Sequence, residues 1–114
     1  MRTRRIPLSE EMIGAVAHRF RALSEPARLR ILQTLEPGEL TVSQVVEALR
    51  GNQPNVSRHL AALYDAGLLK RRREGNNILY SIADPMVLKL CDLVCSSARA
   101  HARQKLHAIA GESR

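Results

Sequence analysis

Hydrophobic residues recur three and four positions apart through most of the first 66 residues, a spacing that places them on one face of a helix. Start and stop signals divide this stretch into four segments. Thr41 followed by Gln44 resembles a capping box, and Gly67 ends the last segment. The predicted helices span about residues 9–23, 24–36, 41–50 and 53–66. The last two, joined by a short turn, form a helix-turn-helix.

The second predicted helix supplies part of the expected core. It is expected to open at Ser24-Glu25-Pro26, because proline suits the first helical turn and a carboxylate is favoured at the positive end of a helix. Its apolar stripe is expected to direct Leu29, Leu32 and Leu35 inward.

The hydrophobic period changes to two after residue 67. Apolar and polar positions alternate on both sides of Gly75-Asn76, two residues that tolerate the positive φ of tight hairpin turns. We therefore predict a β-hairpin over residues 68–82, which forms a wing beside the helix-turn-helix. The expected fold class is mainly α with a small β-hairpin (α+β), a winged helix-turn-helix.

A final helix is predicted to open at Asp84-Pro85 and to run over about residues 84–110. It is too long for a domain of this size to cover, so we expect its apolar face to pair with a second copy of the chain. Residues 1–8 are expected to form a flexible basic tail. Residues 9–110 are expected to form one winged helix-turn-helix domain that ends in this dimerisation helix.

The formal net charge of +7 over 114 residues favours a polyanionic partner. Nucleic acid is favoured over a membrane, because no apolar run approaches the roughly 20 residues that span a bilayer. Three aromatic residues are too few for the stacking platforms that bind single strands, which favours double-stranded DNA. With two cysteines and no secretory signal, the protein is expected in the cytoplasm with reduced thiols.

The helix predicted over residues 53–66 carries side chains of the types that contact bases and phosphates. Asparagine and glutamine pair with adenine, arginine pairs with guanine, and serine suits phosphate. A recognition helix inserts its N-terminal half into the major groove. The candidates on this helix are Gln53, Asn55, Ser57, Arg58 and His59. For any one of them alone, an ordinary solvated helix face is the alternative.

The predicted wing carries a basic run over residues 70–73. Such a run is usually a solvated surface, but at the edge of a wing it can contact phosphates or enter the minor groove. The candidate DNA contacts in the wing are Arg71, Arg73 and Asn76.

Several segments together resemble the ArsR/SmtB family of repressors. They are SEPARLRIL (24–32), QPNVSRHL (53–60), AGLL (66–69) and REG (73–75), together with Leu63. The resemblance covers roughly residues 10–83 and implies a homodimer paired through its first and last helices. It further implies a repressor that binds an imperfect DNA palindrome and leaves it when an effector binds.

The chain departs from two sensor patterns of that family. The helix predicted over residues 41–50 holds no cysteine, so the arsenic-sensing pattern is absent there. The carboxylate and histidine spacing of the zinc-sensing pattern fails in the last helix. His101 and His107 are expected to be solvated rather than metal ligands.

Cys91 and Cys95 are the candidate effector site, as thiol sensor or metal ligands. Four positions apart on a helix, their β-carbons would lie roughly 5 to 6 Å apart, whereas a disulfide needs about 3.5 to 4.5 Å. A bridging arsenite or other soft ion, a polysulfide link, or a disulfide across the dimer axis would relieve that strain. Zinc would need cysteines from both protomers. The alternative is that both pack as small hydrophobes in the dimer interface.

Enzymatic activity is not expected, because no nucleophile has a base partner. Ser57 and His59 come nearest, but side chains two apart on a helix point to different sides. A winged helix that binds protein would carry a less polar and less basic recognition face. We therefore predict a sequence-specific DNA-binding repressor, released by an arsenite-like metalloid, soft metal, oxidant or polysulfide at Cys91 and Cys95. A repressor without such an inducer is the alternative.

Overall fold

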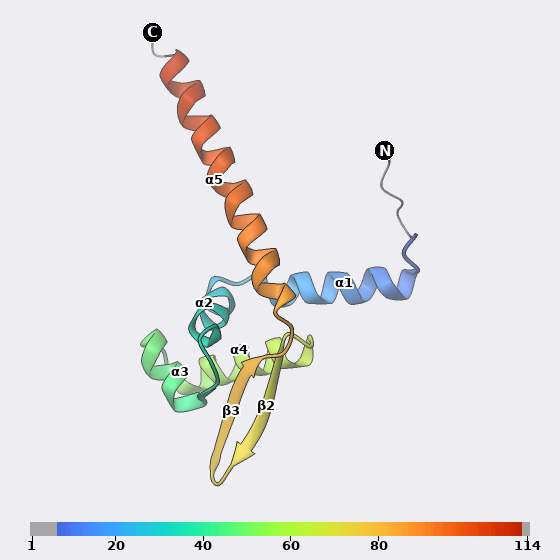
Figure 1. The fold of residues 1–114 in the computed structure, drawn as a ribbon, viewed down its shortest axis with the longest axis vertical. Helices are drawn as coiled ribbons and strands as arrows, with labels where there is room; N and C mark the ends of the chain where they lie inside the picture. Colours follow the sequence, from blue (N-terminus) through green and yellow to red (C-terminus); the bar gives the residue numbers. More distant parts are fainter. Residues whose placement is uncertain (1–6, 113–114) are drawn as a thin grey trace. The chain divides into compact units, whose positions relative to one another are not determined.

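The computed structural model describes residues 7–112, which divide into two compact units between Ala83 and Asp84 (Figure 1). The described helices are α1 (Glu10–Ala22), α2 (Pro26–Leu35), α3 (Val42–Leu49), α4 (Gln53–Asp65) and α5 (Met86–Glu112). The described strands are β1 (Leu40–Thr41), β2 (Leu69–Glu74) and β3 (Asn77–Ile82). All five predicted helices are therefore present. Most of the tail predicted at residues 1–8 lies outside the described residues.

The connection between α1 and α2 follows from local start signals. Ser9 begins α1 by accepting a hydrogen bond from the Met12 amide at 3.1 Å. Within the predicted second signal, Ser24 does not cap α2, since its hydroxyl donates to the Arg21 carbonyl at 2.7 Å. Pro26 supplies the start of α2, because its fixed φ and missing N–H suit the first helical turn.

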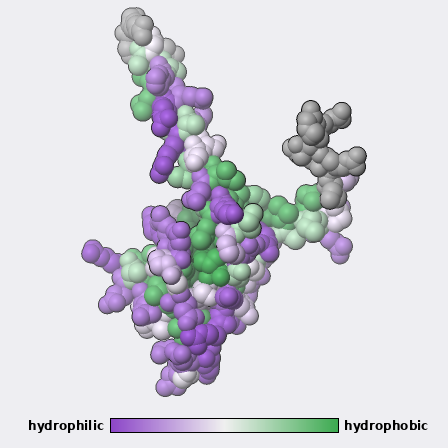
Figure 2. Space-filling model, viewed as in Figure 1, coloured by the Kyte–Doolittle hydropathy of each residue, from purple (hydrophilic) through white to green (hydrophobic). Residues whose placement is uncertain are grey.

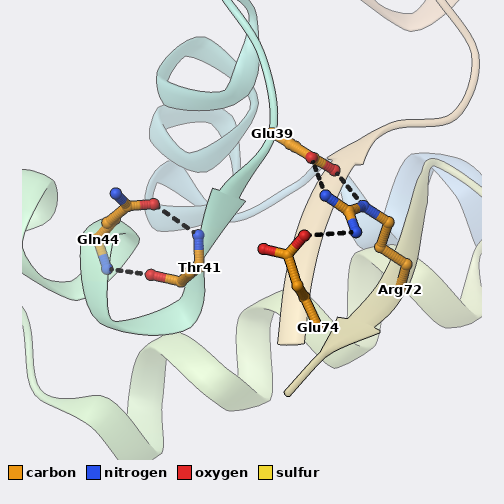
Figure 3. Close-up of polar contacts among 5 residues, drawn as sticks. All are labelled: Glu39, Thr41, Gln44, Arg72 and Glu74. Carbon is orange, nitrogen blue, oxygen red and sulfur yellow. Dashed lines mark hydrogen bonds and ion pairs between the residues drawn. The ribbon is translucent and has the colours of Figure 1, made fainter. Parts of the chain in front are cut away.

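The helix-turn-helix of α3 and α4 is defined by side-chain caps at both N-termini. The predicted capping box is confirmed: the Gln44 amide donates to Thr41 Oγ1 at 3.1 Å, and the Thr41 amide donates to Gln44 Oε1 at 2.9 Å (Figure 3). Arg50 leaves α3 in the left-handed region, with φ of 53°. Asn52 then caps α4 by accepting a hydrogen bond from the Asn55 amide at 2.9 Å. These contacts make the turn between the helices short.

The wing is part of a three-stranded antiparallel sheet rather than a two-stranded hairpin alone. β2 and β3 pair as predicted, and Gly75 supplies a positive φ of 62° at their turn. The sequence prediction missed β1, which pairs Leu40 with Tyr80 and Thr41 with Leu79. Two residues are too few to show an alternating pattern. The strand order β1-β3-β2 joins the wing to the segment that leads into α3.

The core of the first unit lies between the inner faces of α2, α3 and α4 and the base of the sheet. Its most deeply buried side chains are Ile31, Leu32, Leu35, Val45, Leu60, Leu63 and Leu68. Leu32 and Leu35 confirm the prediction for α2, but Leu29 is 43% exposed and Ile31 takes the inward place. Adjacent residues 31 and 32 both point inward because α2 contacts α3, α4 and β3 at once.

Two of the described helices, α1 and α5, each expose several large apolar side chains. On α1 these side chains are Met12, Ile13, Val16 and Phe20, and Figure 2 shows apolar surface along this helix. On α5 they are Met86, Leu93, Val94, Leu106 and Ile109. Contiguous exposed apolar surface commonly marks an interaction site. No helix within residues 7–112 combines the length and hydropathy needed to cross a membrane.

The capping box gives a direct test of this local structure. Thr41→Ala removes the side chain that accepts from the Gln44 amide, so the free energy of unfolding should fall by about 1 kcal/mol. Urea unfolding at a fixed protein concentration measures the change. The matched control is Ser43→Ala, on the exposed side of α3, which should change stability by less than about 0.5 kcal/mol. Equal effects of the two substitutions would contradict the role of the cap.

Candidate nucleic-acid interface

The N-terminal half of α4 presents a polar face to solvent. Gln53, Asn55 and Arg58 are exposed, and Ser57 is half-buried. Arg58 Nη2 lies 3.4 Å from Asn55 Oδ1, a long hydrogen bond that a competing base could replace. Four of the five side chains predicted on this helix therefore remain within reach of a ligand.

His59, the fifth candidate, is directed into the protein. It is 7% exposed, and its Nδ1 accepts a hydrogen bond from Arg28 Nε at 3.1 Å. A buried ring with an occupied acceptor is not free to reach a base edge. The expectation that His59 contacts DNA is therefore not retained. Its place on the apolar stripe follows from its position three residues after Val56 and four before Leu63, both buried.

Arg28 links α2 to α4 at this point. Besides donating to His59, it forms an ion pair with Glu25 at 3.1 Å and lies 3.5 Å from the Ala22 carbonyl oxygen. Its side chain is largely buried, with 13% exposed, whereas that of Glu25 is 47% exposed. Burial lowers the pKa of His59, and Arg58 and Arg28 act in the same direction, while Glu25 opposes them. The neutral imidazole that this hydrogen bond requires is thus the favoured form.

The wing directs alternate basic side chains to two faces. Arg71 and Arg73 lie opposite Tyr80 and Ile78 on β3, whereas Arg72 lies opposite Leu79. The guanidinium of Arg71 lies 3.9 Å from the centre of the Tyr64 ring, and Nη1 lies 3.4 Å from Tyr80 Oη. Arg71 therefore bridges α4 and the wing, and the contact with Tyr80 raises its pKa.

Arg73 and Asn76 are the predicted wing residues that are most open to a ligand. Both are exposed, and within residues 7–112 neither has a side-chain hydrogen bond or ion pair. Figure 2 shows that the wing surface is predominantly hydrophilic. Arg72, by contrast, forms ion pairs with Glu39 and Glu74. Glu39 was not anticipated from the sequence, because its partner lies 33 positions away and no local pattern joins them.

The two cysteines lie on α5 as free thiols, Cys91 half-buried and Cys95 exposed. Burial, together with the nearby carboxylate of Asp92, raises the pKa of Cys91 and so disfavours its thiolate. No group of three or more histidine, cysteine or acidic side chains within the described part of the chain could hold a metal ion. A complete site for an ion that needs more than two ligands would therefore require a second protomer or an exogenous ligand.

Residues 25–71, which run from the start of α2 into the wing, match the sequence pattern of the arsR family of bacterial regulatory proteins. The chain is 45% identical over 71 residues to a probable mercury resistance operon repressor of Streptomyces lividans. That match covers 62% of this chain and 57% of the repressor, so it spans just over half of that relative. The chain is also 38% identical over 86 residues to the regulator NmtR of Mycobacterium tuberculosis. This second match covers 75% of the chain and 72% of NmtR.

Solved structures share the fold. The homodimeric winged helix-turn-helix DNA-binding domain of Mb0332 from Mycobacterium bovis, a possible ArsR-family regulator, superimposes with a TM-score of 0.73. The identity is 34%, and the match covers 85% of this chain and 93% of that domain. The winged helix-turn-helix predicted from the sequence is thereby confirmed.

The hydrogen bond between Arg28 and His59 predicts a pH dependence of stability. Since folding lowers the pKa of His59 below its ordinary value of 6.5, the unfolded chain binds more protons between the two pKa values. Stability should therefore be greatest above about pH 6.5 and fall as the pH drops through the folded pKa. In His59→Asn, whose side-chain oxygen can still accept from Arg28, this fall should be smaller.

Urea unfolding between pH 5 and pH 8 measures this dependence. His18→Asn, which removes an exposed histidine of α1, is the matched control and should leave the fall unchanged. A fall of equal size in His59→Asn and in the unmodified protein would show that His59 is not its source.

Proposed function

The chain belongs to the arsR family of bacterial regulatory proteins, and we propose that it is a transcriptional repressor that binds double-stranded DNA as a homodimer. The observation that carries this proposal is the exposed polar face at the N-terminal half of α4, beside a wing whose Arg73 has no partner in the described structure. Together they supply one group of side chains for base edges and another for phosphates.

In this proposal α4 enters the major groove. Arg58 is suited to pair with guanine, and Asn55 and Gln53 are suited to pair with adenine. Ser57, half-buried at the edge of the same face, is placed for a phosphate. Arg73 and Asn76 extend the contact along the backbone or into the minor groove. Arg71 contributes mainly by joining the wing to α4 through Tyr64.

Homodimerisation is supported separately for each unit. α1 exposes a row of apolar side chains that includes Met12, Val16 and Phe20, and α5 exposes Leu93 and Val94. Exposed apolar surface of this kind commonly marks a site that a partner covers. The similar domain from Mycobacterium bovis is described as homodimeric. A two-fold dimer would place two α4 helices on the half-sites of an imperfect palindrome.

For the inducer we propose a soft, thiol-binding species at Cys91 and Cys95. Thiolates favour soft ions such as arsenite or mercuric ion over magnesium or calcium. A similar protein is named as a probable mercury resistance operon repressor, which supports the same class of ligand. Binding would release DNA only if the linked thiols favour a placement of the two α4 helices that does not match successive major grooves.

A repressor with no thiol inducer is the second candidate. The raised pKa of Cys91 favours it, because a protonated, half-buried thiol reacts slowly with oxidants. In that case Cys91 would pack as a small hydrophobe between protomers.

Fluorescence anisotropy with a duplex from the upstream region of its own gene tests DNA recognition. Arg58→Ala should weaken binding to that duplex by about 1 to 3 kcal/mol and weaken binding to random DNA much less. Arg99→Ala, which removes the same charge from α5, is the matched control and should leave this difference unchanged. Stoichiometric titration should give two chains for each duplex. Equal losses on both duplexes would place Arg58 on phosphate, and absence of binding by the unmodified protein would refute the repressor.

The same assay tests the inducer. Arsenite or mercuric ion should release DNA from the reduced protein and leave the Cys91→Ser/Cys95→Ser double variant bound. Magnesium at the same concentration is the control, since a hard cation should release neither protein. Persistent binding of the unmodified protein would favour the repressor without a thiol inducer. Release of DNA from the double variant would place the effector site elsewhere.

A further inference from the structure

Arg72 stands apart from the other basic residues of the wing because two carboxylates enclose its guanidinium (Figure 3). Nε and Nη2 donate to the two oxygens of Glu39 at 3.0 and 2.5 Å, and Nη1 donates to Glu74 at 3.2 Å. Glu74 lies two residues along β2, whereas Glu39 comes from the segment between α2 and β1. The contact with Arg72 lowers the pKa of Glu39, so this carboxyl stays ionised.

Stability alone is a weak reason for this arrangement. The side chains of Arg72, Glu39 and Glu74 are 50%, 37% and 66% exposed, so water and salt screen their attraction. Exposed ion pairs of this kind contribute little to stability. The larger effect is on the charge that the wing offers to a ligand. Arg72, Glu39 and Glu74 together carry one positive and two negative charges. This group therefore adds no net positive charge to the wing, whereas Lys70 does.

A bidentate carboxylate also occupies the donors that a phosphate would use. The planar guanidinium offers paired N–H groups that fit carboxylate and phosphate in the same geometry. With Glu39 on one edge and Glu74 on Nη1, a phosphate would have to displace at least one carboxylate and approach the other against its negative charge. Arg73, one residue further along β2, meets no such obstacle.

We propose that Glu39 is a positioning residue that holds Arg72 away from the DNA backbone and thereby lowers the affinity of the wing for DNA of any sequence. The inference rests on the DNA binding proposed above. Its consequence is for specificity: a phosphate contact strengthens binding to every sequence alike, so withholding it reduces competition from random DNA without loss of base contacts.

The test is the salt dependence of binding to random duplex DNA, measured by anisotropy for the full chain. Glu39→Gln should weaken the hold on the Nε and Nη2 edge of Arg72 and steepen the slope of log K against log salt by about 0.9 for each phosphate newly contacted. For equal binding at 1 M salt, this steeper slope corresponds to roughly eightfold tighter binding at 0.1 M salt for each contact. Glu36→Gln is the matched control: it removes the same charge three residues away, at an exposed carboxylate without an ion pair to Arg72. It should leave the slope unchanged.

Two variants separate this role from a structural one. Arg72→Ala in the otherwise unmodified protein should leave the slope unchanged, because Arg72 does not contact phosphate there. The double variant Glu39→Gln/Arg72→Ala should lose the steepening. A shallower slope in Arg72→Ala, or equal slopes in Glu39→Gln and Glu36→Gln, would overturn the proposal. If the unmodified protein binds no DNA, the proposed function fails with it, whereas binding with unaltered slopes refutes this inference alone.

Discussion

The orientation of α4 against α2 is the constraint on which the rest of the structure depends. Leu60 and Leu63 are fully buried opposite a helix whose Ile31, Leu32 and Leu35 are themselves almost fully buried. Each such side chain contributes roughly 1.5 to 3 kcal/mol when it leaves water, more than any single polar contact described for the site. Because this apolar stripe fixes the rotation of α4, it also decides that Asn55 and Arg58 point outward.

The helices of this chain could be predicted because their signals are local. Ser9, the Thr41 and Gln44 pair, and Pro26 each act within one helical turn of the residues that they cap or start. The features that were predicted wrongly depend instead on contacts between segments that are distant in the sequence. β1 exists only because β3 lies beside it, and Leu29 is exposed because three neighbouring elements, rather than one, determine which residues of α2 face inward.

The candidate site also combines features that local sequence predicts with features that depend on distant contacts. The candidate side chains on α4 could be chosen from the sequence, since their types are those that can contact bases, but where each side chain lies depends on partners far away in the sequence. Arg28 lies 31 positions from His59, and Glu39 lies 33 positions from Arg72. For His59 the sequence did indicate burial, because this residue shares the apolar face of Val56 and Leu63.

The wing shows why net charge overestimates the charge available for binding. Three consecutive arginines have three different environments: Arg71 lies over Tyr64, Arg72 lies between two carboxylates, and Arg73 has no side-chain partner in the described structure. Strand alternation separates the first and third from the second, and each face then meets different neighbours. The number of arginines in a basic run therefore sets only an upper limit on the guanidinium groups that a wing can offer to a ligand, and the packing around each one determines whether it is open.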